Sequence, residues 1–262
     1  MDGILRAGFI ADTHDEQYGL MRRAVGHMMD KGGVDYLFHL GDFLYNFGSI
    51  AERNSYRPYR TLAQRLGLIQ KEFGLKEIYV IPGNHEVAHP EKGLCELEEF
   101  SIHEKVIDVE GYKFLGYGGG YDFAKLNGWD RYDDKRYKCD FGKFETLLRD
   151  SHVDIVLLHQ LEKKVFGGDS LRQAIDDLKP KIVISGHTHK HGFEFYERPL
   201  YTSCGPIFPL DGKRPRIMGK SSFGILDIKN RFAKMELYFF KKDGNRDRVE
   251  LDGEASINFR NH

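Results

Sequence analysis

The chain has only three cysteines among its 262 residues, and Cys95, Cys139 and Cys204 lie far apart in the sequence. An odd number without short spacing supplies neither a disulfide framework nor a zinc ribbon, and it suits a reducing compartment. Residues 1–6 lack the basic region and apolar stretch of a signal peptide, and no later run is long enough to span a membrane. These absences predict a cytoplasmic protein with no membrane partner.

The chain also lacks an excess of charge of either sign, with 39 Lys and Arg against 40 Asp and Glu. A protein that binds nucleic acid or an anionic membrane usually has a clear basic surface, so nucleic acid is not the favoured partner, and only a local basic patch could bind it. We find no internal repeat and no low-complexity tract. The length and the hydrophobic content of 40% predict a single domain that spans residues 1–262.

Five apolar runs, each short, rich in β-forming residues and bounded by turn residues, predict buried strands. The runs are residues 4–11, 34–40, 77–82, 153–158 and 181–185. A polar cluster follows each run directly. The clusters are Asp12-Thr13-His14, Gly41-Asp42, Gly83-Asn84-His85-Glu86, His159 and Gly186-His187-Thr188-His189. Because ligands bind at the carboxyl ends of the strands of open α/β sheets, we expect the five clusters to meet in one site.

Helical patterns fill most segments between these strands, at residues 17–31, 56–73, 92–100, 141–150 and 169–178. This alternation indicates an α/β fold with parallel strand pairing. Residues 104–109 and 112–117 predict a hairpin. Past residue 190 the pattern is mainly β, with strands expected at 193–197, 200–203, 222–228 and 231–240. We interpret residues 191–262 as the region of a second, more antiparallel sheet.

The side chains of the clusters suit metal ions. In Asp12-Thr13-His14 and His187-Thr188-His189 the two donors are two residues apart, so an extended backbone would direct them to the same side. The glycines that precede Asp42, Asn84 and His187 let the backbone turn sharply and approach an ion closely. Imidazoles, carboxylates and one amide, without cysteine, favour manganese, iron, zinc or cobalt.

The charge of such a site indicates its substrate. If Asp12 and Asp42 are the only anionic ligands of two divalent ions, the centre stays positive even after a bound water loses a proton, and it favours an anionic substrate. Two ions about 3.5–4 Å apart can clamp a phosphoryl group and generate hydroxide near neutral pH. Hydrolysis of phosphate esters is therefore the leading predicted reaction.

The order D-x-H, G-D, G-N-H-E, V-x-x-H and G-H-x-H resembles that of the calcineurin-like metallophosphoesterase superfamily over residues 12–189. The resemblance implies a four-layer α/β/β/α sandwich of two packed mixed sheets with flanking helices, and a centre of two divalent or mixed-valence metal ions. It assigns Asp12, His14 and His189 to one ion, Asn84, His159 and His187 to the other, and Asp42 to a bridging position. It also implies that His85 is the catalytic histidine beside the phosphate and that Glu86 supports the ligands.

Differences from better-known branches narrow the expected function. The second motif lacks the later aspartate and arginine of the protein serine/threonine phosphatases. It does match the GDxxY of purple acid phosphatases, but these lack the histidine found here as His14, so the role of Tyr45 stays open. The D-x-H pattern is closest to the group that contains bacterial cyclic-nucleotide phosphodiesterases.

We therefore expect a dinuclear centre that hydrolyses a small-molecule phosphate ester, with phosphodiesters first, through a metal-bound hydroxide. A phosphomonoesterase, a nuclease resembling the recombination-repair members and a non-catalytic metal-binding scaffold are the alternatives. The pattern leaves the oligomeric state and the physiological substrate open.

Two loops are candidates for substrate specificity. Residues 118–140 form a long connection rich in aromatic and basic side chains, and we hypothesise that it is a lid over the metals; a surface excursion packed on its own aromatics fits equally well. Arg53 and Arg57 could bind phosphate oxygens, although solvated charges at a helix start are the simpler interpretation. The histidines outside the motifs are interpreted as core or surface residues. They are His27, His39, His103 and His152, with His191 at most a neighbour of the ligands.

Overall fold

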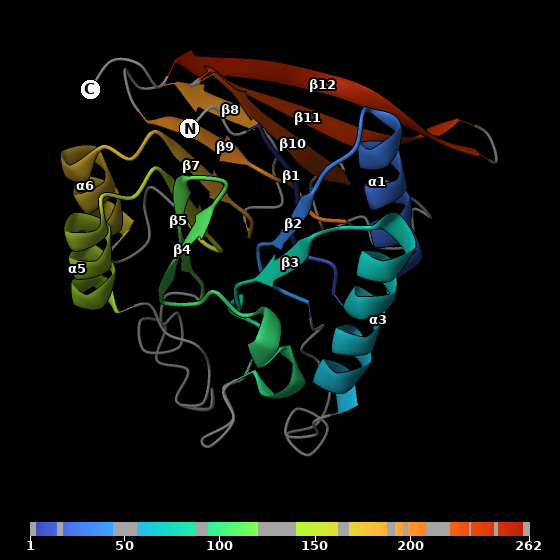
Figure 1. Cartoon of the computed structure of the whole chain (residues 1–262), viewed down its shortest axis with the longest axis horizontal. Coiled ribbons are helices and arrows are strands. Elements are labelled where there is room, and N and C mark those ends of the chain that lie inside the picture. The colour runs from blue at the N-terminus through green and yellow to red at the C-terminus, as the bar shows by residue number, and fades with distance from the viewer. Residues whose placement is uncertain are drawn as a thin grey trace.

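Two six-stranded sheets pack face to face, and helices cover their outer faces (Figure 1). The computed structural model describes residues 4–14, 18–43, 57–86, 94–119, 140–161, 168–187, 192–195, 199–207, 221–230, 232–243 and 246–258. The resulting order of layers is helix, sheet, sheet, helix. The four-layer sandwich expected from the motifs is therefore confirmed.

The first sheet has the strand order β12-β11-β10-β1-β2-β3. Its parallel half consists of β1 (Leu5–Ile10), β2 (Tyr36–His39) and β3 (Glu77–Val80). Its antiparallel half consists of β10 (Ser222–Lys229), β11 (Phe232–Asp243) and β12 (Arg246–Asn258). The two halves join where β1 pairs antiparallel with β10.

The second sheet has the strand order β4-β5-β6-β7-β9-β8. Four central strands run parallel: β5 (Tyr112–Tyr117), β6 (Ile155–Leu158), β7 (Ile182–Ser185) and β9 (Leu200–Ser203). The antiparallel edges are β4 (Lys105–Val109) and β8 (Gly192–Phe195). Both sheets are thus mixed, as predicted.

Alternation of side chains along the strands divides the core into three layers. Phe9 of β1, Phe38 of β2 and Phe114 of β5 stack between the sheets, with ring centroids 5.2 and 5.0 Å apart along the series. Their neighbours Ile10 and Leu37 face the opposite side and pack under the helices of the first sheet. Because each central strand buries both faces, it reads as a continuous apolar run in the sequence.

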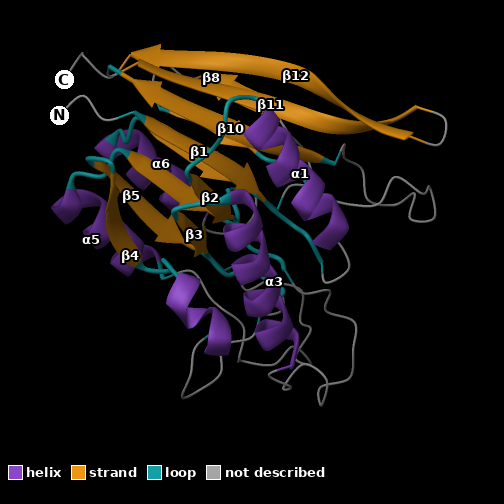
Figure 2. Ribbon diagram, turned by 45° about the vertical axis from the view of Figure 1, so that its right-hand side comes forward, coloured by secondary structure: helices purple, strands orange, loops and turns teal. Residues whose placement is uncertain are grey.

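The helices lie where the sequence places them, with small differences at their ends (Figure 2). Against the first sheet pack α1 (Tyr18–Asp30) and α3 (Arg57–Phe73), and against the second pack α5 (Phe141–Ser151) and α6 (Gly168–Leu178). The helix expected at residues 92–100 is a short 3-10 helix, η1 (Cys95–Phe100), in the described part of that range. No helix among the described residues is long and apolar enough to cross a membrane.

The strands after residue 190 differ from the expectation of a sheet of their own. β8 and β9 complete the second sheet, whereas β10, β11 and β12 extend the first. The sequence interpretation also missed β12, a strand of 13 residues at the edge of the first sheet. Its run RDRVELDGEASIN has few apolar residues because most of its described side chains are partly or fully exposed. An edge strand of this kind lacks the apolar alternation on which strand prediction depends.

Candidate metal centre

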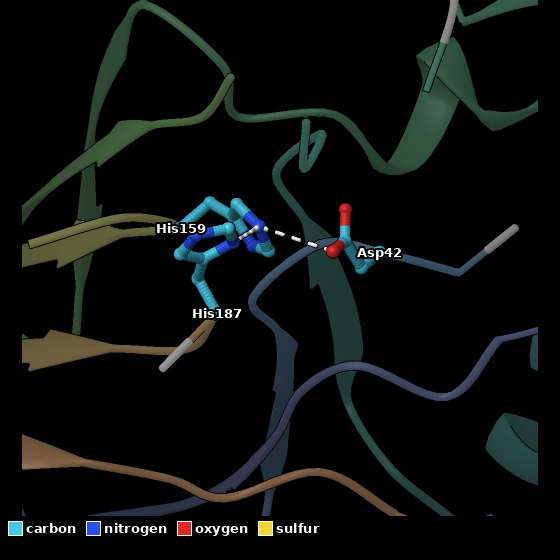
Figure 3. Close-up of side chains that lie close together, drawn as sticks. All are labelled: Asp42, His159 and His187. Atoms are coloured by element: carbon cyan, nitrogen blue, oxygen red, sulfur yellow. Dashed lines mark hydrogen bonds and ion pairs between the residues drawn. The ribbon is translucent and has the colours of Figure 1, made fainter. Parts of the chain in front are cut away.

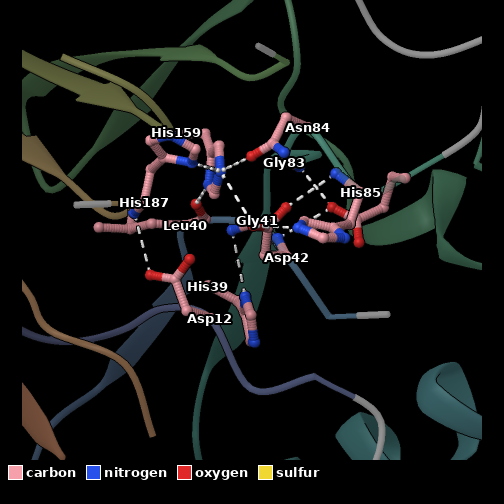
Figure 4. A network of polar contacts seen from close by, with 11 residues as sticks. Asp12, His39, Leu40, Gly41, Asp42, Gly83, Asn84, His85, His159 and His187 are labelled. Atoms are coloured by element: carbon pink, nitrogen blue, oxygen red, sulfur yellow. Dashed lines mark hydrogen bonds and ion pairs between the residues drawn. The ribbon is translucent and has the colours of Figure 1, made fainter. Parts of the chain in front are cut away.

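The five polar clusters meet where the carboxyl ends of strands from both sheets come together (Figure 4). Asp12 and Asp42 follow the paired strands β1 and β2, and His159 and His187 follow the paired strands β6 and β7. Two hydrogen bonds join these sets. The backbone N–H of His187 donates to Asp12 Oδ2 at 3.0 Å, and His159 Nδ1 lies 2.7 Å from the carbonyl oxygen of Leu40.

The donors converge through turns and not through an extended backbone. Four donor residues have left-handed φ angles: 52° at Asp12, 42° at His14, 54° at Asp42 and 63° at His187. This corrects the expectation that the D-x-H pair points to one side along an extended segment. A left-handed φ in a non-glycine residue costs of order 1–3 kcal/mol and persists where the surroundings enforce it, often at functional sites.

Hydrogen bonds between neighbouring turns hold these conformations. The backbone N–H groups of Asp12 and His14 donate to the carbonyl oxygens of Gly41 and Asp42, at 2.9 and 3.0 Å. The fully buried carboxylate of Glu86 accepts from the backbone N–H of Asp42 at 2.9 Å and from that of Gly83. Glu86 therefore ties the second cluster to the third, as the predicted supporting role requires.

Gly41 has the steric role that its position predicts. Its φ is +93°, and a Cβ atom there would lie 2.6 Å from the backbone nitrogen of Gly83 and 2.7 Å from His159 Nδ1. Any other residue would push the second cluster away from the third and from β6. Glycine thus lets three clusters approach one another closely.

Two groups of potential metal donors share the carboxylate of Asp42. One group contains Asp12, His14 and Asp42, the other contains Asp42, His159 and His187, and within each group the ligand atoms lie within 4.8 Å of one another. Figure 3 shows the two imidazoles of the second group directed toward Asp42. Buried carboxylates and imidazoles that face one another fit divalent transition-metal ions better than calcium, which takes oxygen ligands only.

Asn84 belongs with the second group, because its Oδ1 lies 2.9 Å from His159 Nε2, which is itself 3.2 Å from His187 Nδ1. Six of the seven predicted ligands are therefore brought together. The seventh, His189, lies outside the described residues, as do Tyr45, Arg53 and His191.

His85 lies beside the second cluster and is more accessible than Asp42. Its side chain is 24% exposed, against 1% for Asp42, and its Nε2 is 3.7 Å from Asp42 Oδ2. The backbone N–H of His85 donates to Asp42 Oδ1 at 2.9 Å, and its ring packs edge-on against His14 with centroids 5.2 Å apart. A partly exposed imidazole therefore lies next to the shared carboxylate.

Two buried groups of the centre, Asp12 and His159, hold protons near neutral pH that bound cations would displace. Burial raises the pKa of Asp12 to about 8. Burial opposes the charged forms of Asp42 and His159 as well, but their mutual attraction outweighs it, so the pKa of Asp42 lies well below its usual range and that of His159 rises to about 9. Metal ligands must be deprotonated, so cation binding here would release protons.

His39 is the residue whose importance the sequence interpretation missed. It is 1% exposed, which confirms the core assignment, but both ring nitrogens make polar contacts within the site, to Thr13 Oγ1 at 2.9 Å and to the backbone N–H of Gly41 at 3.2 Å. The signal in the sequence was a polar residue inside an apolar run, two positions before the Gly41-Asp42 cluster.

One described end of the 118–140 connection lies next to the third cluster, and the other contacts Tyr117, directly before the connection. The backbone N–H of Gly119 donates to the carbonyl oxygen of Pro82 at 2.8 Å, and the Tyr117 hydroxyl donates to the carbonyl oxygen of Asp140 at 2.6 Å. Residues 120–139, which include most of the predicted lid, lie outside the described residues.

The two packed sheets, with carboxylates and histidines gathered at their shared carboxyl edge, define an α/β sandwich with a candidate metal centre. The model of the calcineurin-like phosphoesterase family matches residues 5–191, and the chain belongs to this family. The family hydrolyses phosphate esters with bound divalent metal ions. A comparison with curated proteins finds no match.

Two solved structures share the fold at low sequence identity. The protein TT1561 of Thermus thermophilus is 13% identical, with a TM-score of 0.60 over 86% of this chain and 94% of that one. GAP50, described as the anchor in the inner membrane complex of Plasmodium, is 11% identical, with a TM-score of 0.62 over 98% of this chain and 90% of that one. Vps29 of Chaetomium thermophilum is 10% identical, with a TM-score of 0.49 over 97% of each chain.

Proposed function

We propose that this protein hydrolyses small-molecule phosphate esters, with phosphodiesters as the preferred class, at a centre of two divalent metal ions. The observation that carries the proposal is the buried carboxylate of Asp42, which belongs to both donor groups. A shared carboxylate between two sets of imidazole and carboxylate donors is the arrangement that two neighbouring ions require. His189 would complete the first set, as the motif order implies.

The proposed ligand set also selects the charge of the substrate. Only Asp12 and Asp42 are anionic among the seven proposed ligands, so two divalent ions would leave the centre positive and attract a phosphate ester. When bound, the ions would hold phosphoryl oxygens and lower the pKa of a coordinated water. His85, partly exposed beside Asp42, would stabilise charge on the phosphoryl oxygens or give a proton to the leaving alkoxide.

Phosphodiesters are the first choice because the second motif differs from that of the protein phosphatases, and because one proton-donating histidine suffices to expel an alkoxide from a monoanionic diester. The nearly balanced charge of the chain speaks against a nuclease. The presence in the sequence of all seven ligand positions and of His85 speaks against a non-catalytic scaffold.

The test is turnover of matched aryl phosphate mono- and diesters by protein reconstituted with manganese, iron, zinc or cobalt. We expect two metal ions per chain, faster hydrolysis of the diester, and loss of activity with a chelator that returning the metal restores. A strong preference for the monoester would replace the diesterase proposal by a monoesterase. Stoichiometric metal with no hydrolysis of any ester would favour the scaffold.

A further inference from the structure

We infer that His39 is a positioning residue, which holds the turn carrying Asp12 and His14 against the turn carrying Asp42 and so pre-forms the first donor group. The inference rests on the proposed metal centre and deepens it. His39 itself is not one of the proposed ligands. It is the last residue of β2, and Figure 4 shows its ring next to Gly41.

The hydrogen bonds of His39 fix its tautomer. A backbone N–H can only donate, so Nδ1 accepts from Gly41 N–H and the ring proton is on Nε2, which donates to Thr13 Oγ1. Burial lowers the pKa of His39 to about 3, so the ring is neutral and can accept on one side while it donates on the other. Its ring also packs edge-on against Phe43, with centroids 4.8 Å apart.

These two contacts reach the points that set the positions of the ligands. Thr13 stands between Asp12 and His14, and Gly41 directly precedes Asp42. Asp12, His14 and Asp42 all have left-handed φ angles, which cost free energy. Two backbone hydrogen bonds, from the N–H groups of Asp12 and His14, already join the two turns. The imidazole of His39 adds a side-chain link from Thr13 to Gly41, so each turn restrains the other.

The link predicts a selective effect on the two donor groups. His159 and His187 come from β6 and β7. Contacts that do not use the Thr13 hydroxyl hold them: His159 Nδ1 lies 2.7 Å from the carbonyl oxygen of Leu40, and the backbone N–H of His187 donates to Asp12 Oδ2. Loss of the hydroxyl at Thr13 would therefore loosen the first group and leave the second in place. Residues that orient metal ligands commonly contribute about 10–100-fold to metal affinity.

The experiment measures Mn²⁺ binding by calorimetry in variants that retain one donor group at a time. His187→Ala leaves the first group, and Asp12→Asn leaves the second. Thr13→Val is added to each, because it keeps the shape of the side chain but removes the acceptor for His39 Nε2–H. We expect Thr13→Val to weaken Mn²⁺ binding about 10–100-fold in the His187→Ala background and less than threefold in the Asp12→Asn background.

Further variants separate positioning from general stability. Thr13→Ser retains the hydroxyl and should restore most of the affinity in the His187→Ala background. His39→Asn keeps an acceptor for Gly41 N–H but loses the donor to Thr13, so it should match Thr13→Val. His27→Asn is the control for loss of an inward-facing histidine. His27 packs against Phe223 and Tyr238 in the helix layer, so its replacement should leave Mn²⁺ affinity unchanged.

Equal weakening in both backgrounds, or none in either, would overturn the inference while leaving the proposed function intact. A wild-type protein that binds no Mn²⁺, iron, zinc or cobalt would overturn the proposed function, and with it this inference.

Discussion

Asp42 is the residue on which both halves of the centre depend. Its carboxylate accepts the backbone N–H of His85 at 2.9 Å, lies 3.4 Å from His159 Nε2 and belongs to both donor groups. Its backbone N–H is held by the buried Glu86, so the side chain has little freedom to move. A residue with this many roles should tolerate no change of charge.

We predict that Asp42→Asn weakens the binding of two metal ions, whereas Asp12→Asn weakens the binding of one, because Asp12 belongs to a single group. His85→Ala should keep near-normal metal content and lower the rate by about 10²–10⁴, since it removes a group that stabilises charge or donates a proton. Metal analysis and ester turnover on the same preparations would check the division. Equal loss of metal in Asp42→Asn and His85→Ala would contradict it.

Gly41 is the backbone counterpart of Asp42. Gly41→Ala should destabilise the fold by about 1–3 kcal/mol and weaken metal binding, because a Cβ would meet Gly83 and His159 and because φ is +93°. Gly67 is the matched control. It lies within α3, where an added methyl group would meet no neighbouring side chain within 4 Å, so Gly67→Ala should stabilise by about 0.5–1 kcal/mol. Urea unfolding of both variants would show opposite signs; a neutral Gly41→Ala would refute the steric role.

At the scale of elements, turns and caps decide where strands and helices stop. The β4–β5 hairpin turns at Glu110 and Gly111, with φ angles of 52° and 83°, which is the double positive φ of the turn that matches the twist of paired strands. The edge strand β12 carries a register irregularity opposite Leu237 and Tyr238, together with many charges. Irregular pairing and charge are devices that discourage an edge strand from pairing with another chain.

Helix α5 begins at a side-chain cap that can be tested directly. Asp140 precedes the helix in an extended conformation, and its Oδ1 accepts the backbone N–H of Lys143 at 3.1 Å. Asp140→Ala should lower the free energy of unfolding by about 1 kcal/mol, and Asp140→Asn, which retains the acceptor, should lower it much less. Denaturant melts of the two variants would distinguish the cap from the backbone contacts of Asp140, which both variants keep; equal losses would rule out the cap.

At the scale of the whole molecule, buried neutral histidines make stability depend on pH. His103 accepts the backbone N–H of Gly118 at 3.0 Å. Burial lowers the pKa of His103 to about 4; the negative charge of Glu104 opposes this shift, and the positive charge of Lys143 adds to it. An unfolded chain has a histidine pKa of about 6.5. Between these values the unfolded chain binds a proton that the folded chain does not, so stability is full above about pH 6.5 and falls as the pH drops toward 4.

We therefore predict that His103→Asn, which retains an acceptor but does not titrate, loses less stability than the wild type between pH 7 and pH 5. The difference should be about 2 kcal/mol, because the folded His103 stays neutral down to pH 5 whereas the unfolded histidine is protonated below about pH 6.5, at about 1.4 kcal/mol per pH unit. Urea unfolding of the two proteins at both pH values would measure it. Parallel losses in the two proteins would show that His103 titrates normally in the folded state.

The central strands, most helices and the candidate donor residues can be predicted from the sequence. Runs such as residues 153–158 bury both faces, so their composition alone identifies them, and the order of the polar clusters identifies the family. The exposed strand β12 could not be predicted, because an edge strand pairs through its backbone and needs few apolar side chains. Backbone hydrogen bonds leave no pattern in the sequence.

How the donors are held depends on the packing of distant segments and cannot be predicted from the sequence. The tertiary structure placed β10, β11 and β12 beside β1, set Asp12, His14, Asp42 and His187 in left-handed turns, and brought His39 between Thr13 and Gly41. These features depend on contacts between segments far apart in the chain, and such contacts outweigh the local backbone preference of each residue. A left-handed φ is unfavourable for an aspartate by itself and becomes stable only when a neighbouring turn supplies hydrogen bonds. The residue types therefore determine the chemistry of the site, and the packing of the two sheets determines its geometry.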